Sequence, residues 1–289
     1  MRIGAHISSA GGLSKIPRRA KEIGAECIQI FAGSPRRYDI FFPKQEEIEK
    51  YRQEIQENGI NPVYIHASYL LNLASEDTAI LEKSLENLKK TMQFSSLIKA
   101  DGVVYHPGSP KGKDKEEAIE REIVNIIKVL KETPEETFLV IENMVKKKRI
   151  GANPDEIGYI LKKVNSPRLK VCVDTAHSFE SGNIKDFNKE NLEEWISWWD
   201  DKVGVENIAL FHINDSLTDF ESQHDRHGNI GEGFIGEKGF QEMATFQEIR
   251  NKPWILEVPG FDGKGPDKKN IDILKKIRSF NKNLNQEKS

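Results

Sequence analysis

Short apolar runs rich in β-branched residues alternate with longer amphipathic stretches from one end of the chain to the other. Runs that are apolar at nearly every position are typical of strands in a parallel sheet whose faces are covered by helices. The strand candidates are RIGAHIS (2–8), CIQIFAG (27–33), VYIHASY (63–69), GVVYHPG (102–108), TFLVIEN (137–143), KVCVDTAH (170–177), NIALFHIND (207–215) and WILEVPG (254–260).

The stretches between these runs predict helices. The longest is expected to begin after Ser75, an N-cap residue followed by two acidic residues in the first turn. It places on one face the side chains of Ile80, Leu81, Leu85, Leu88 and Met92. Further helices are expected over residues 46–58, 115–131, 155–163, 192–203, 239–250 and 268–278.

Eight strand–helix units in 289 residues favour a closed (β/α)8 barrel, the TIM barrel, over an open doubly wound α/β sheet. No GxGxxG turn follows the first strand candidate, which argues against a dinucleotide-binding fold. No low-complexity linker or shift of composition divides the chain. We therefore predict a single barrel domain over residues 1–280 and a polar, frayed tail over residues 281–289.

Histidines and acidic residues recur near the carboxyl ends of the strand candidates. Their successive separations of 40, 36, 32, 38 and 45 residues each fit one strand–helix unit, which takes about 30 residues or more. The carboxyl ends of all barrel strands open on one mouth, where barrel active sites lie, so these side chains are expected to converge. They are His66, His106, Glu142, Asp174, His212 and Glu257.

His177 follows Asp174 by three residues, and Asp225 and His227 lie in the loop after the seventh strand, so all three can join this cluster. Any one of these residues alone is more simply explained as an ordinary core or rim residue. Five histidines and four carboxylates at one rim are costly, however, unless cations neutralise the acids. Imidazole and carboxylate ligands without a thiolate suit Zn²⁺ or Mn²⁺, and nine such groups exceed the needs of one tetrahedral ion. We predict two or three ions that share a bridging carboxylate.

The remaining histidines are assigned differently. His6 ends the first strand and is expected to support or pack against the mouth, whereas His224 is expected in a solvated loop. Cys27 and Cys172 lie in apolar runs without a CxxC spacing, which indicates buried, reduced thiols. The chain opens without an apolar signal segment and contains no run of membrane-spanning length, so a cytoplasmic protein is expected.

These residues lie in motifs that resemble the endonuclease IV family of apurinic/apyrimidinic (AP) endonucleases. DRHGNIGEG is the most specific motif, and the resemblance covers nearly the whole chain. In the order expected of the family, the motifs are GAHISSAGG (4–12), SYLLNLAS (68–75), YHPGS (105–109), IEN (141–143), DTAH (174–177), HINDS (212–216), DRHGNIGEG (225–233) and LEVPG (256–260).

The resemblance implies a barrel that holds three zinc ions, with Mn²⁺ as an alternative at one or more sites. Each ligand of the family has a match here: His66 and His106 for one ion, Glu142 as the bridge to a second, Asp174, His212 and Glu257 for that second ion, and His177, Asp225 and His227 for the third. Glu142 and Glu257 would take part in catalysis. The implied reaction is hydrolysis of the phosphodiester 5′ to an abasic site, leaving a 3′-hydroxyl and a 5′-deoxyribose phosphate, with trimming of blocked 3′ ends as a related activity.

The resemblance also implies that Arg36, Tyr69 and Leu70 push into the DNA stack and kink it. An abasic nucleotide lacks stacking and pairing, so its extrusion costs least. The formal net charge of −3 argues against nucleic acid, but three zinc ions would change it to about +3, with all of the gain at the mouth. The basic run of Lys146, Lys147, Lys148 and Arg149 follows Glu142 and is either part of a DNA-binding face or an ordinary solvated loop.

The chain departs from the family at two places. Gly33 and Ser34 stand where the family usually has a basic residue and an asparagine, and Met144, Val145 and the basic run replace a glycine-rich turn. The expected partner is double-stranded DNA with abasic sites or blocked 3′ ends, bound by a monomer that associates with the nucleoid in use. The alternatives are a xylose-isomerase-like sugar isomerase or epimerase with one or two ions, and a non-catalytic DNA- or sugar-binding barrel.

Overall fold

Eight parallel strands close into a barrel in the order β1-β10-β7-β6-β5-β4-β3-β2. The structure is a computed structural model and describes residues 1–111 and 114–286. All eight predicted strands are confirmed, and with them the predicted (β/α)8 fold. The barrel strands are β1 (Ile3–His6), β2 (Ile28–Phe31), β3 (Val63–His66), β4 (Gly102–Tyr105), β5 (Phe138–Glu142), β6 (Leu169–Asp174), β7 (Ile208–His212) and β10 (Trp254–Leu256).

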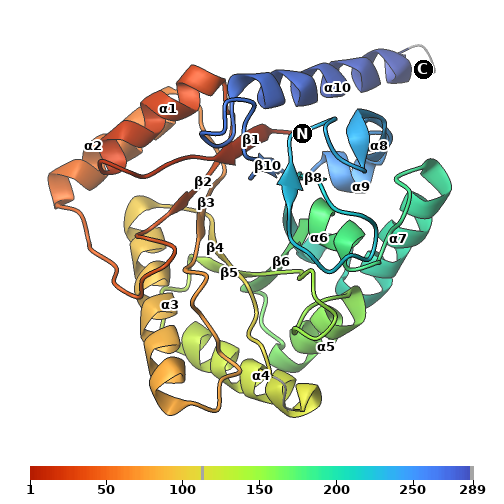
Figure 1. Cartoon of the computed structure of the whole chain (residues 1–289). Coiled ribbons are helices and arrows are strands. Elements are labelled where there is room, and N and C mark those ends of the chain that lie inside the picture. The colour runs from red at the N-terminus through yellow and green to blue at the C-terminus, as the bar shows by residue number, and fades with distance from the viewer. Residues whose placement is uncertain (112–113, 287–289) are drawn as a thin grey trace.

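Figure 1 shows the helices arranged as a ring around these strands. None of the helices within the described ranges is both long and apolar enough to span a membrane. The α-helices are α1 (Ile16–Ile23), α2 (Gln45–Glu57), α3 (Thr78–Ile98), α4 (Lys115–Lys131), α5 (Pro154–Val164), α6 (Thr175–Glu180), α7 (Lys189–Val203), α8 (Gly236–Met243), α9 (Gln247–Arg250) and α10 (Lys268–Gln286), and short 3-10 turns cover Leu13–Lys15 and Val205–Asn207.

Several predicted boundaries are wrong, each for a local reason. Asp77, not Ser75, caps α3, because its carboxylate accepts hydrogen bonds from the amides of Ala79 and Ile80, at 2.9 and 3.2 Å. The sixth strand ends at Asp174, which caps α6, so residues 175–177 are helical rather than extended. The helix predicted over 239–250 is two helices, α8 and α9.

The two ends of the chain also differ from expectation. The hydrophobic pattern does not predict α1, although Pro17 in its first turn and Gly24 at its C-cap are ordinary helix boundary signals. The pattern predicts that the last helix ends at Arg278, but α10 continues to Gln286 because no glycine or proline follows to end it. The polar tail predicted over 281–289 is therefore helical up to residue 286, and residues 287–289 lie outside the described part of the chain.

The first strand and the last helix are joined at the amino-terminal end of the barrel. Arg278 of α10 donates to both carboxylate oxygens of Glu26, at 2.6 and 2.9 Å, and to the carbonyl of Met1 at 3.1 Å. Glu26 in turn accepts a hydrogen bond from the amide of Ile3 at 3.0 Å. Gly4 is required where β1 meets β2, because a Cβ at this position would lie 1.7 Å from the carbonyl oxygen of Cys27. The barrel therefore closes at β1.

The barrel interior is stacked in layers, because alternate side chains of each strand point inward. An apolar layer of buried side chains fills the middle of the barrel and contains both cysteines as free thiols. Two residues further along each strand, the last inward side chain faces the mouth, and we call the set of these eight side chains the polar layer. The apolar layer consists of Cys27, Tyr64, Val104, Val140, Cys172, Leu210 and Ile255, and the polar layer of His6, Gln29, His66, His106, Glu142, Asp174, His212 and Glu257.

Candidate metal centre

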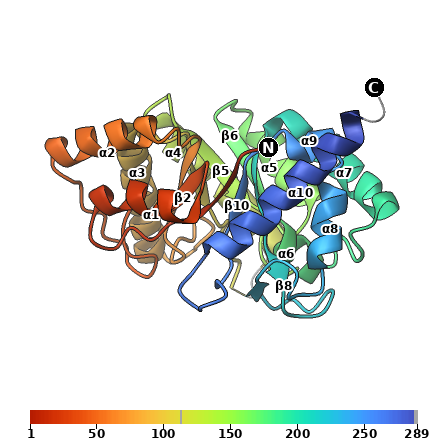
Figure 2. The same ribbon diagram turned by 90° about the horizontal axis from the view of Figure 1, so that it is seen from above.

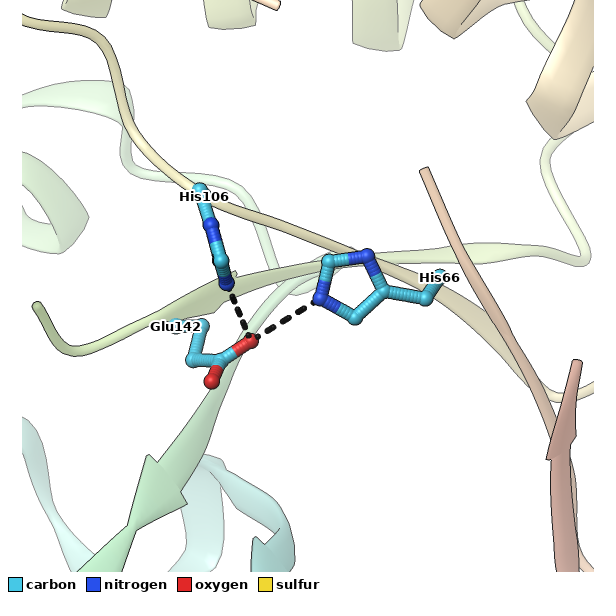
Figure 3. Close-up of side chains that lie close together, drawn as sticks. All are labelled: His66, His106 and Glu142. Carbon is cyan, nitrogen blue, oxygen red and sulfur yellow. Dashed lines mark hydrogen bonds and ion pairs between the residues drawn. The ribbon is translucent and has the colours of Figure 1, made fainter. Parts of the chain in front are cut away.

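Three groups of possible metal ligands lie in and above the polar layer. In the first group, His66 from β3 and His106 after β4 both point a ring nitrogen at Glu142 on β5 (Figure 3). The Nε2 atoms of His66 and His106 lie 3.2 and 3.3 Å from Glu142 Oε2. His66 Nδ1 donates to the carbonyl of Ala67 at 2.8 Å, so in the neutral ring the lone pair is on Nε2 and faces the group.

The second group shares Glu142 with the first. His212 Nδ1 lies 3.1 Å from Glu142 Oε1, 3.3 Å from Glu257 Oε2 and 3.9 Å from Asp174 Oδ2. Glu142 thus turns one oxygen to each group, which is the arrangement expected of a bridging carboxylate. Ligand atoms of all four residues lie within 4.8 Å of one another.

The third group combines His177 of α6 and His227 of the short strand β9 (His227–Gly228) with two carboxylates. Asp174 Oδ2 lies 3.7 Å from His227 Nε2, so Asp174 stands between the second and third groups. Asp225 is about half exposed and approaches from the solvent side, at 3.6 Å from His177 Nε2 and 3.4 Å from His227 Nε2. His177 Nδ1 donates to the carbonyl of Asn143 at 2.8 Å, which leaves Nε2 for the group.

The chemistry of these groups fits divalent cations. The Nε2 atoms of His177 and His227 are buried and have no hydrogen-bond partner among the described residues, although carboxylates surround them. A ring nitrogen lone pair and a carboxylate oxygen repel each other unless a proton or a cation lies between them. With three or four nitrogen and oxygen donors in each group and no thiolate required, Zn²⁺ or Mn²⁺ is suitable.

The pKa values of the groups show how strongly the centre attracts positive charge. Burial raises the pKa values of Glu142, Asp225 and Glu257, but adjacent histidines hold all three below the usual value for a carboxyl group. Burial lowers the pKa values of His177 and His212, but neighbouring negative charges raise both well above the usual value for histidine. The surrounding negative charge therefore favours the protonated form of both imidazoles, and bound cations would displace protons from them.

The glycine-rich run that follows His227 folds around the side chain of Asp215. Asp215 begins β8 (Asp215–Ser216), which pairs with β9 at the face seen along the lower edge of Figure 2. Its two carboxylate oxygens accept hydrogen bonds from four backbone amides of this run at 2.9 to 3.2 Å, so the loop folds around one buried acid. A Cβ at Gly233 would lie 2.3 Å from the carbonyl of Ser216, so this approach needs glycine. The amides belong to Gly231, Gly233, Ile235 and Gly236.

Glu180 holds the other side of the same loop. Its Oε1 accepts hydrogen bonds from Ser216 Oγ at 2.6 Å, from Thr218 Oγ1 at 3.2 Å and from the amide of Arg226 at 3.2 Å. Because Arg226 lies between the two loop residues of the third group, Glu180 fixes their position. His224, two residues earlier, is exposed, as the sequence predicts.

The sequence pattern does not single out Gln29 and gives His6 only a supporting role. Gln29 is fully buried on β2, and its side chain contacts His6, His212 and Glu257. His6 Nδ1 lies 3.2 Å from Glu257 Oε1, so His6 does support the second group. The position of Gln29 along its strand could have revealed it. Gln29 is the polar residue two positions after Cys27, as His66 is two positions after Tyr64.

The residues expected to enter DNA form one ridge beside the first group. Tyr69 stacks on the ring of His106 at 5.4 Å and contacts the ring of His66 edge-on at 5.2 Å. The amide of Tyr69 donates to the carbonyl of Pro35 at 3.0 Å, which joins its loop to the loop that carries Arg36. Tyr69 and Leu70 are 47% and 40% exposed, and Arg36 is exposed too.

The basic run divides into two parts. Lys146, Lys147 and Lys148 are exposed at the mouth, and Lys147 forms an ion pair with Glu221 of the neighbouring loop. Arg149 is half-buried, and burial lowers the pKa of its guanidinium while the charges of nearby carboxylates oppose that shift. Arg149 is therefore enclosed beside the centre rather than displayed on the surface.

A groove of about 1250 Å³ runs outward from the centre. His6, Tyr69 and Glu257 line its inner end, and the loop after β2 lines its outer part with Phe41 and Phe42. Those two rings are 79% and 44% exposed, so the outer wall offers apolar faces to whatever enters the groove.

Comparison with known proteins shows which family this barrel belongs to. Residues 17–277 match the family described as the xylose isomerase-like TIM barrel. The chain is 37% identical over 278 residues to the probable endonuclease 4 of Halothermothrix orenii, covering 96% of this chain and 100% of that protein. It is 36% identical over 261 residues to the probable endonuclease 4 of Persephonella marina, covering 90% and 91%. The chain therefore belongs to the endonuclease IV family.

Solved structures agree with this assignment. Endonuclease IV from Thermus thermophilus superposes with a TM-score of 0.84 at 29% identity, covering 96% of this chain and 98% of that one. A D-tagatose 3-epimerase-like protein superposes with a TM-score of 0.71 at 16% identity, covering 98% and 99%, and shows the shared fold alone. The predicted family is confirmed, and with it the prediction that the chain is an enzyme, a hydrolase of the endonuclease class.

Zinc loading at pH 7 is expected to release protons, because nearby negative charges raise the pKa values of His177, His212 and His227 and favour the protonated rings until a cation replaces the proton. Titration calorimetry in buffers of different ionisation enthalpy measures the release. His177→Asn should release about one proton fewer, and His224→Ala, at an exposed site, should match the wild type. Full loading without proton release would contradict the assigned protonation.

Proposed function

We propose that the chain is a zinc-dependent DNA repair endonuclease that hydrolyses the phosphodiester 5′ to abasic sites in double-stranded DNA. The products would be a 3′-hydroxyl and a 5′-deoxyribose phosphate, and trimming of blocked 3′ ends would be a second use of the same centre in base excision repair. One observation carries the proposal: in a member of the endonuclease IV family, nine imidazole and carboxylate side chains gather in three adjoining groups at one barrel mouth.

We assign one zinc ion to each group. His66 and His106 would hold the first, Asp174, His212 and Glu257 the second with Glu142 shared between them, and His177, Asp225 and His227 the third. When bound, such ions supply a nucleophile from water at neutral pH and stabilise charge on phosphoryl oxygens, and Mn²⁺ can do so as well.

The two glutamates have separate tasks in this proposal. Glu142 is fully buried between the first two groups. Its Oε2 faces the first group and its Oε1 the second, so this carboxylate sets the distance between the two groups. Glu257 keeps Oε1 hydrogen-bonded to Gln29 at 2.6 Å, while Oε2 faces the second group at 3.3 Å from His212. A carboxylate that ligates the second ion through Oε2 would also help to orient the attacking water beside it.

The mouth is suited to a kinked duplex with an extruded sugar. Tyr69 and Leu70 stand above the first group as an exposed aromatic and apolar wedge, with Arg36 on the adjoining loop. An abasic nucleotide leaves the stack at the lowest cost, so selectivity follows from extrusion and needs no base contact. Lys146 and Lys148 add positive charge on the same face for the flanking phosphates, with Lys147 and Arg149 beside them.

The main alternative is a sugar isomerase or epimerase. The epimerase-like neighbour shares the fold at only 16% identity, and about four ligands serve the one or two ions expected of that class. The third group has no use in that reaction. A binding protein without catalysis is also disfavoured, because the full set of carboxylates is present. We further propose that residues 1–280 act as one catalytic domain of a cytoplasmic, nucleoid-associated monomer.

The direct test is incision of a duplex with a single abasic site by zinc-loaded protein. Glu257→Gln should leave binding of this duplex largely intact and slow incision about 10²–10⁴-fold, because a neutral amide replaces the carboxylate that ligates the second ion and orients the attacking water. Asp219→Asn, at an exposed acid of the loop after β7, makes the same carboxylate-to-amide change as the matched control and should incise like the wild type. The proposal fails if the wild type makes no nick on the 5′ side of the abasic site, or if chelator does not abolish the nick.

The exposed lysines of the basic run are expected to bind phosphates. A Lys146→Ala, Lys148→Ala double variant should reduce the slope of log affinity against log salt by about 0.9 for each phosphate that a lysine no longer neutralises. A Lys128→Ala, Lys131→Ala double variant makes the same charge change at the end of α4 on the opposite barrel face and should leave the slope unchanged. Equal slopes for wild type and the first variant would show that the run only faces solvent.

A further inference from the structure

Gln29 is the one member of the polar layer that is neither a histidine nor an acid. Its side chain is fully buried and makes three polar contacts within that layer. Oε1 lies 2.9 Å from His212 Nε2, and Nε2 lies 2.6 Å from Glu257 Oε1 and 3.1 Å from His6 Nδ1. One amide thus joins three strands, β1, β7 and the end of β10, to β2.

The chemistry of the contacts fixes which way this amide is oriented. A carboxylate oxygen only accepts hydrogen bonds, so the amide nitrogen of Gln29 must face Glu257. The amide oxygen then faces His212, and because that oxygen only accepts, His212 Nε2 must carry the hydrogen.

A neutral imidazole with its hydrogen on Nε2 has its lone pair on Nδ1. His212 Nδ1 is the atom that faces the second group, at 3.1 Å from Glu142 Oε1 and 3.3 Å from Glu257 Oε2. The same amide binds Glu257 through Oε1, which leaves Oε2 directed at the group. Gln29 therefore selects the ligating atom of both residues.

We propose that Gln29 is a positioning residue that sets the tautomer of His212 and the rotation of Glu257 for the second ion. The inference rests on the metal centre of the proposed function and adds a residue that contacts no ion itself. Loss of a partner that orients a metal ligand typically weakens metal affinity about 10–100-fold. The effect should be confined to the second ion, because the polar contacts of the Gln29 side chain with described residues reach two ligands of that ion and His6.

Two variants separate the contributions of this amide. Gln29→Met keeps the length of the side chain but removes both the acceptor for His212 and the donor to Glu257. Gln29→Glu keeps an acceptor for His212 and loses the donor to Glu257. Tyr64→Phe is the matched control, because it removes a buried hydroxyl in the apolar layer below, where Tyr64 Oη donates to the carbonyl of Ala209 at 3.4 Å.

Each protein is loaded with ¹¹³Cd²⁺, and its sites are followed by ¹¹³Cd NMR and by competition with a chelator of known affinity. The ion of the second group is identified by its coupling to the ring protons of His212. Wild type and Tyr64→Phe should give the same spectrum and affinities. Gln29→Met should shift or broaden the His212-coupled resonance and weaken that site about 10–100-fold, with the other resonances unchanged.

Gln29→Glu should retain the coupling to His212 and still weaken the site, which distinguishes the two contacts if Gln29→Met folds poorly. A Gln29→Met spectrum identical to that of Tyr64→Phe would overturn the role of Gln29 alone, as would an equal loss at every site. A wild-type protein that takes up no cadmium would overturn the metal centre of the proposed function, and the positioning role with it.

Discussion

The structure depends on one constraint: barrel closure brings the last inward side chain of each of the eight strands to one mouth, and in this chain these side chains are imidazoles, carboxylates and one amide. Strand alternation leaves these groups no route to solvent except the mouth. Their mutual contacts at 3.1 to 3.9 Å cannot all be hydrogen bonds, because lone pairs oppose lone pairs. Such a layer is stable only with added positive charge, as protons or as metal ions.

The rest of the mouth holds the polar layer and the residues of the third group beside it. Asp174 belongs to the polar layer and also caps α6 by accepting a hydrogen bond from the amide of His177, so it fixes the position of His177 as well. Asp215 and Glu180 bind the backbone of the loop after β7 and thereby bring His227 against the layer. Loops usually carry function on a rigid barrel, and here buried acids hold the loop together with the apolar packing of Ile230 and Ile235.

Much of the fold and of the candidate metal centre was predictable because strands and polar strand ends recur at regular intervals along the sequence. Eight apolar runs gave the strand count, and polar residues near the strand ends gave six candidate ligand positions that the structure brings together, since both follow from the repeat of the strand–helix unit. Gln29 has the same register as the ligand candidates, two positions after Cys27, but the sequence pattern did not single it out because an amide in an apolar strand is not a typical metal ligand. The third group depends on loop conformation. Position after the seventh strand allowed Asp225 and His227 to join the cluster, but only the motif resemblance grouped them with His177. The contacts of Asp215 that hold this loop join residues sixteen to twenty-one positions apart. Spacing alone also could not show that Arg149 turns inward while Lys146 stays exposed.

The central claim, that the polar layer and the loop after β7 form a three-ion centre, is tested most directly by crystals of zinc-loaded protein measured at the zinc absorption edge. The account predicts three anomalous peaks at the mouth, each with nitrogen or oxygen atoms of its own group at about 2.0–2.2 Å. Peaks away from the mouth, or a single peak at full zinc occupancy, would contradict it.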